Sequence, residues 1–123
     1  MPPYQRHLDG KMAEQIACTH LQKQGLILLE KNYRCFSGEI DLIMKDSQHI
    51  VFIEVRSRKR TEYGSALESV TKPKQMRIIR TATHFLQTKK WLFRINSRFD
   101  IVQVHLTCST QPLEWIKNAF WVE

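Results

Sequence analysis

Two acidic side chains on neighbouring segments of the chain are best placed to do chemistry. Residues 38–44 and 50–58 each alternate apolar and polar side chains, a period typical of half-buried β-strands. The break between them is long enough only for a hairpin, so we expect two antiparallel strands. With residues 47–48 in the turn, Asp41 lies directly opposite Glu54.

The same register makes further predictions about this hairpin. It places Glu39 opposite Arg56, which predicts a salt bridge between them. It also collects one apolar face, formed by Ile40, Leu42, Met44, Val51, Ile53 and Val55. A slip of one residue would mix the two faces, so the pattern favours this pairing.

Opposed carboxylates need an explanation, because like charges about 4.5–5.5 Å apart across a strand pair destabilise it. One of them can be protonated, basic neighbours can compensate, or a divalent cation can lie between them. Mg²⁺ is commonly held by one or two carboxylates, which makes Asp41 and Glu54 candidate ligands. The other interpretation is a solvated face with surface ion pairs, worth about 0–1 kcal/mol. The hairpin alone leaves both open.

A third acid lies on the first predicted helix, residues 11–24, which we expect to end at Gly25. Its apolar arc contains Met12, Ala13, Ile16, Ala17, Cys18 and Leu21. Glu14 falls inside this arc, and a buried charge needs a partner. Either Glu14 reaches water or Arg34 from a boundary position, or it is a third acid directed at the hairpin site.

The net charge of +7 speaks to partners rather than to fold. Eight of the 19 basic residues fall between residues 56 and 80, interrupted there only by Glu62 and Glu68. They are Arg56, Arg58, Lys59, Arg60, Lys72, Lys74, Arg77 and Arg80. An anionic polymer is the usual partner of such a surface. For Lys74 and Arg77, phosphate contact and ordinary surface charge both remain open.

Other classes of protein are disfavoured. The three cysteines are widely spaced and form no CxxC unit, so the sequence predicts neither a disulfide framework nor a zinc site. No apolar run approaches the ~20 residues that cross a bilayer, and the N-terminus lacks an apolar signal core. We expect one cytoplasmic domain over residues 1–123.

The remaining elements complete an α/β pattern. Residues 26–36 form a bent strand, and residues 58–68 form a polar, basic loop. A second helix begins near Pro73, with a core stripe of Met76, Ile79, Ala82, Phe85 and Leu86. A buried strand over 99–106 and a last edge strand over 113–121 follow.

Several motifs resemble those of the YraN family of small bacterial proteins, over residues 10–120. They are Asn32-Tyr33-Arg34, Gly38-Glu39-Ile40-Asp41-Leu42-Ile43, Phe52-Ile53-Glu54-Val55-Arg56 and Arg98-Phe99-Asp100, together with Glu14 and Lys74. That family is similar to archaeal Holliday-junction resolvases and to the restriction-endonuclease-like PD-(D/E)xK superfamily. The resemblance implies a mixed central sheet flanked by helices, in αβββαβ order.

The resemblance also implies an activity, metal-assisted hydrolysis of phosphodiester bonds in branched or structured DNA, by a homodimer. Asp41 looks like the motif aspartate and Glu54 like the first residue of the (D/E)xK tripeptide. With the backbone carbonyl of Val55 they would hold Mg²⁺ or Mn²⁺. Glu14 looks like the acid that resolvases supply from their first helix.

Arg56 stands where the superfamily has its lysine, and an arginine does not give up its proton. Arg56 could still stabilise charge on the phosphate, and Lys74 or Lys72 could supply the missing lysine. The residues expected to contact nucleic acid are Arg58, Lys59, Arg60, Lys72, Lys74 and Arg77.

Two alternatives belong to other functional classes. One is a catalytically silent nucleic-acid-binding module of the same fold. The other is a protein-interaction adaptor in DNA repair or uptake.

Overall fold

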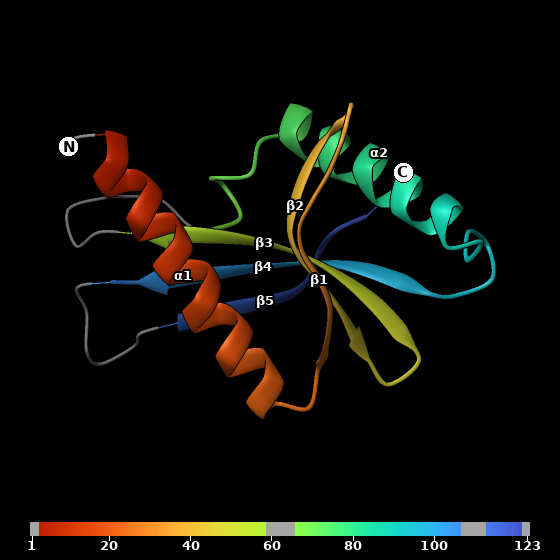
Figure 1. Ribbon diagram of the computed structural model, residues 1–123, viewed down its shortest axis with the longest axis horizontal. Coiled ribbons are helices and arrows are strands. Elements are labelled where there is room, and N and C mark those ends of the chain that lie inside the picture. Colours follow the sequence, from red (N-terminus) through yellow and green to blue (C-terminus); the bar gives the residue numbers. More distant parts are fainter. Residues whose placement is uncertain (1–2, 59–65, 107–112, 122–123) are drawn as a thin grey trace.

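The computed structural model describes residues 3–58, 66–106 and 113–121, with side chains from residue 8 onward (Figure 1). Its elements are α1 (Pro3–Lys23), β1 (Ile27–Cys35), β2 (Gly38–Asp46), β3 (His49–Arg58), α2 (Lys72–Thr88), β4 (Ser97–His105) and β5 (Leu113–Phe120). The αβββαβ order is present, and β5 is the expected edge strand. The restriction-endonuclease-like α/β architecture is confirmed.

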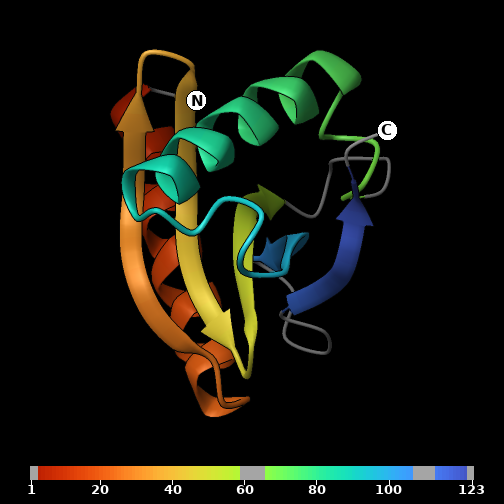
Figure 2. The same ribbon diagram turned by 90° about the vertical axis from the view of Figure 1, so that its right-hand side faces the viewer.

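One mixed sheet with the order β1-β2-β3-β4-β5 forms the centre of the molecule. β1, β2 and β3 pair antiparallel, β3 and β4 pair parallel, and β5 returns antiparallel to β4. The parallel pair requires a crossover, which α2 provides. Figure 2 shows α1 and α2 on opposite sides of β1 and β2.

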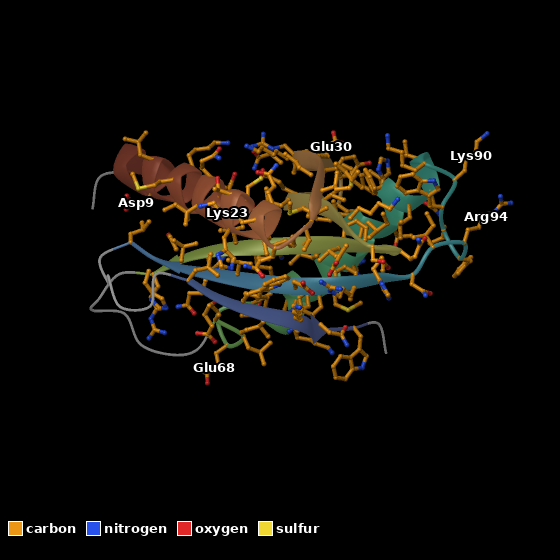
Figure 3. All side chains as sticks on the ribbon, turned by 90° about the horizontal axis from the view of Figure 1, so that it is seen from below. Asp9, Lys23, Glu30, Glu68, Lys90 and Arg94 are labelled. Atoms are coloured by element: carbon orange, nitrogen blue, oxygen red, sulfur yellow. The ribbon has the colours of Figure 1, made fainter. Side chains whose placement is uncertain are left out.

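Both faces of the sheet are buried. Leu42, Met44, Val51 and Ile53 pack beneath α1 against Ala13, Ala17, Cys18 and Leu21. Ile43, Ile50, Phe52 and Ile101 pack on the other face against Ile78, Ala82 and Phe85 of α2. The expectation of half-buried strands with one apolar face is therefore wrong, because each face is covered by its own helix. Figure 3 shows the side chains that fill these layers, with labelled charged residues such as Glu30, Lys90 and Arg94 projecting outward.

The helices differ in detail from the predictions. α1 begins at Pro3 rather than near residue 11, and its end is followed by Gly25 with φ +98°, as expected for a C′ glycine. Met12 is 55% exposed because only a narrow stripe of small side chains meets the sheet. In α2, Met76 is likewise 39% exposed, while Thr81, which was not expected in the core, is buried.

The basic loop expected over 58–68 lies mostly outside the described residues. Ala66 and Val70, which lead from it into α2, are buried in the cluster beneath that helix. Within the described part of the chain, no helix combines the length and hydropathy needed to span a membrane.

Candidate active site

Asp41 and Glu54 lie where β2 and β3 separate. The paired residues run from Asp46 and His49 to Leu42 and Ile53, which confirms the predicted register over this part of the hairpin. The ladder ends there, and Asp41 and Glu54 occupy the next position on each strand. Figure 1 shows β1 and β2 rising away from β3 beyond this point. The sheet therefore forks at the two acids.

At the same place, the side chains of β2 stop alternating regularly between the two faces of the sheet. Leu42 packs beneath α1, whereas Ile40 packs with Ile43 in the cluster beneath α2. Strict alternation would put Ile40 and Leu42 on the same face, so the predicted grouping of these two residues is wrong. The interruption falls at Asp41, whose side chain is thereby placed in the fork between the helices.

The Asp41 carboxyl is held in its neutral form. Burial, followed by the charge and the hydrogen bond of the nearby Glu54, raises the pKa of Asp41 from 3.8 to about 9, and Glu14 contributes a smaller part of this increase. The backbone N–H of Val55 donates to Asp41 Oδ2 at 2.8 Å, which acts in the opposite direction. Near neutral pH Asp41 therefore keeps its proton. The hydrogen bond between the two side chains shows that the predicted close approach of Asp41 and Glu54 is present.

Two cations approach Glu54, whose side chain is 7% exposed. Lys74 Nζ lies 2.6 Å from Glu54 Oε2, and Arg56 Nη1 lies 3.7 Å from the same oxygen. Lys74 comes from the first turn of α2, which is capped by Thr71 and contains Pro73 as its second residue. The second helix therefore brings a lysine to the acid pair. Of the two lysines named as possible substitutes for the missing tripeptide lysine, Lys74 is the one that contacts Glu54.

The predicted Glu39–Arg56 salt bridge is wrong. Glu39 Oε2 instead meets Arg34 Nε at 3.3 Å, across the β1–β2 ladder in which these residues are partners. The β2–β3 ladder ends before it reaches Glu39, so Glu39 and Arg56 do not face each other. Arg56 is consequently left beside Glu54.

Glu14 faces the fork from α1. Asn32 Nδ2 donates to Glu14 Oε1 and to Glu39 Oε1, each at 3.0 Å, and Lys11 Nζ donates to Asn32 Oδ1 at 3.3 Å. Glu14, Asn32, Arg34, Glu39 and Asp41 line one pocket. The interpretation of Glu14 as a third acid near the hairpin site is therefore favoured.

Sequence reasoning missed the role of Asn32. Its backbone has φ +51°, a left-handed conformation that asparagine tolerates better than most residues. The available signal was an asparagine in the middle of a strand, where this residue type is depleted.

The chemistry of the donors fits a hard divalent cation. Among the described residues, no three His, Cys, Asp or Glu side chains converge to hold a metal ion. A site here would therefore take two carboxylates and a backbone carbonyl, an oxygen-only set with room for waters, as Mg²⁺ prefers. A cation bound here could displace the proton that Asp41 holds.

Comparison with known proteins places the chain in a family. A model of the uncharacterised protein family UPF0102 matches residues 13–104. The chain belongs to this family, the YraN family. A UPF0102 protein of Nitrosococcus oceani is 42% identical over 123 residues, which covers 100% of this chain and 99% of the relative. UPF0102 proteins of Pseudomonas aeruginosa (45% over 113 residues, 90% of each chain) and Coxiella burnetii (47% over 114 residues, 93% of this chain and 92% of the relative) are similar. These names state a family and no activity.

The basic residues of this UPF0102 chain separate into groups. Lys74 is at the acid pair, and Lys72 and Arg77 are exposed on the same helix. Arg58 is half-buried at the end of β3. Lys59 and Arg60 lie outside the described residues. The structure thus brings Lys74 and Arg56 to the carboxylates and places Lys72 and Arg77 along α2.

Proposed function

We propose that this protein is a divalent-metal-dependent nuclease that hydrolyses phosphodiester bonds of structured or branched DNA. One observation carries the proposal: Asp41 is buried beside Glu54, the burial and this neighbour together raise the pKa of Asp41 to about 9, and Lys74 Nζ lies 2.6 Å from Glu54 Oε2. Perturbed carboxyls beside a lysine are a functional-site signature with a stated physical cause. The resemblance to nucleases in the order of these residues supports the same reaction.

Asp41, Glu54 and the backbone carbonyl of Val55 would hold the ion. Mg²⁺ or Mn²⁺ would polarise the scissile phosphate and lower the pKa of a bound water. Asp41 would lose its proton when an ion binds, so the affinity for the ion should rise with pH up to about 9. Glu14, linked to Glu39 through Asn32, adds negative charge beside the pair.

Lys74 is the residue that we assign to the lysine role. A lysine ammonium can orient an attacking water and exchange a proton with it, whereas the Arg56 guanidinium keeps its protons. Arg56 lies on the same carboxylate and can stabilise the negative charge that develops on the phosphate. In this proposal, Lys74 of α2 and Arg56 of β3 together take the role of the lysine in the (D/E)xK tripeptide.

The test is cleavage of a labelled four-way junction and of a matched linear duplex, with Mg²⁺, with Mn²⁺ and with chelator. We expect cleavage only with a divalent ion, and a loss of at least about 100-fold in Asp41→Ala and Glu54→Ala. Cleavage that survives both substitutions would come from a contaminant and would contradict the proposal.

One observation favours a second candidate, a nucleic-acid-binding module without chemistry. Glu54 already has Lys74 and Arg56 as partners, so the site is electrostatically satisfied without an ion. Junction binding together with an absence of cleavage in every divalent ion tested would select this candidate.

A further inference from the structure

An aromatic side chain is almost fully exposed to solvent at the tip of the β1–β2 hairpin. Cys35 and Gly38 are the last partners of this ladder, so Phe36 lies in the turn, and it is 95% exposed. Its ring meets the ring of His84 edge-on, with centroids 6.2 Å apart. His84 Nδ1 in turn bonds the Tyr33 hydroxyl of β1. The exposed Phe36 ring therefore contacts a side chain, His84, that is itself held by a hydrogen bond.

The hairpin tip rests directly on α2. A Cβ at Gly38 would lie 3.3 Å from Thr81 Oγ1 and 3.8 Å from Arg77 Cβ, and φ at Gly38 is +151°. This close approach needs glycine. It fixes the position of Phe36 relative to the exposed face of α2.

That face is basic. Arg77 and Arg80 are exposed on α2, and Arg80 lies three residues after Arg77 and four before His84, which places the three side chains on adjoining surface. An exposed phenylalanine among arginines matches the two needs of a nucleic acid strand, base stacking and phosphate neutralisation.

The same face connects Phe36 to the acid pair. Lys74 contacts Glu54, Arg77 lies at Gly38, and His84 lies at Phe36. On the hairpin, the three strand steps from Asp41 to Gly38 span about 10 Å, and Phe36 lies beyond them in the turn. Along α2, the ten residues from Lys74 to His84 span about 15 Å. At the rise of a duplex strand, this distance corresponds to about four or five nucleotides.

We propose that Phe36 stacks on an unpaired base of the substrate while Arg77 and Arg80 contact the adjoining phosphates. The inference rests on the proposed function and specifies its substrate class. A paired duplex hides the faces of its bases, so a protruding ring can stack only at a gap, a flap or a junction. Phe36 thus selects DNA that has unpaired bases about four or five nucleotides from the bond held at Asp41 and Glu54.

The test measures binding of the full chain in chelator, so that cleavage does not enter. The probes are a labelled single strand of about 12 nucleotides, a splayed-arm DNA and a blunt duplex. We expect Phe36→Ala to weaken binding of the first two by about 5- to 100-fold and to change duplex binding less than about twofold. Phe36→Trp keeps the ring and should retain the affinity. Phe93→Ala is the matched control. Phe93 is also a highly exposed phenylalanine (97%), but it lies in the segment between Lys89 and Ser97 that follows α2, not at the hairpin tip.

The outcomes separate this inference from the proposed function. Equal losses on all three probes, no loss in Phe36→Ala, or the same loss in Phe93→Ala would overturn the inference while leaving metal-dependent cleavage intact. Selective loss without cleavage in any divalent ion would sustain the inference and remove the nuclease. A wild-type chain that binds none of the probes would overturn both.

Discussion

At the scale of single residues, Asp41 imposes a pH-dependent cost on folding. Its pKa lies at about 9 in the folded protein, against an ordinary value of 3.8. Between these values the unfolded chain ionises Asp41 while the folded chain keeps it protonated, so the folded state binds more protons. The free energy of unfolding therefore falls as pH rises through this window.

Asp41→Asn should remove this cost. An asparagine keeps the acceptor for the Val55 N–H and can donate to Glu54, but it does not ionise. In chelator, we expect the variant to be more stable than the wild type at about pH 8, with the difference vanishing near pH 4. Urea unfolding at about pH 4, 6 and 8 measures it, with exposed Glu114→Gln as control. Identical pH slopes in wild type and Asp41→Asn would refute the raised pKa of Asp41.

Lys74 and Arg56 make separable contributions to the proposed reaction. Lys74→Arg keeps the positive charge next to Glu54 but loses the small ammonium group, so we expect junction cleavage to fall by about 100-fold or more. Binding of the junction in chelator should change much less. Arg56→Lys, in contrast, restores the tripeptide lysine and should leave cleavage intact or raise it. A large loss in Arg56→Lys would show that Arg56 acts in a way that charge stabilisation does not describe.

The sequence predicted the facing of Asp41 and Glu54 because a hairpin has few registers and the apolar pattern selects one. The partner of Glu39 was not predictable from the same pattern. It depends on where the β2–β3 ladder ends, and that end follows from the fork between two helices. Lys74 was named as a candidate, but its contact with Glu54 needed the placement of α2 on the sheet.

At the scale of elements, Asp100 joins three strands. This buried carboxylate of β4 accepts from Arg98 Nε at 3.1 and 3.2 Å, from Trp115 Nε1 of β5 at 2.9 Å and from the Asn118 backbone N–H at 2.9 Å. Arg98 also donates to Asp46 at the end of β2, at 2.8 Å. The network lies near the register shift in β5 pairing, between Phe99 and Ile101.

Removing this carboxylate should loosen the edge of the sheet. Asp100→Ala takes one of two carboxylate partners from the half-buried Arg98 guanidinium and leaves an indole N–H and a backbone N–H short of a partner, so we expect a loss of about 3–5 kcal/mol in the free energy of unfolding. Asp100→Asn should cost less, because one acceptor oxygen remains. Urea titration measures both variants, and Glu114→Ala on the exposed face of β5 is the control. A cost below about 1 kcal/mol in Asp100→Ala would mean that packing alone holds β5.

The order of the helices and strands could be predicted from the sequence more readily than which of their side chains are buried. The alternation in residues 38–44 predicted a strand correctly, but Ile40 and Leu42 lie on different faces because β2 changes its facing at Asp41. Likewise, the apolar arc of α1 suggested that Met12 is buried, while the helix meets the sheet through Ala13, Ala17, Cys18 and Leu21. A one-dimensional pattern records which residues are apolar. It does not record how wide the covering surface is.

At the scale of the whole molecule, charge is the property that the proposed partner would sense. A protein with a net charge of +7 attracts any polyanion, so attraction alone does not distinguish a site from a basic surface. The number of phosphates that the protein neutralises does distinguish them, because log K falls linearly with log salt with a slope of about −0.9 for each neutralised phosphate. A local interface predicts that charges on α2 enter this slope and that charges elsewhere do not.

Arg77→Ala should therefore reduce the magnitude of the slope by about 0.9, measured in chelator on a duplex or a junction at several salt concentrations. Lys23→Ala removes the same charge from the end of α1, on the opposite face of the sheet, and should shift the affinity without changing the slope. Equal changes in both variants would indicate diffuse attraction, in which no face is used. A wild-type chain with no salt dependence would remove both nucleic-acid functions and leave the adaptor, because contacts with phosphate cannot form without releasing counterions.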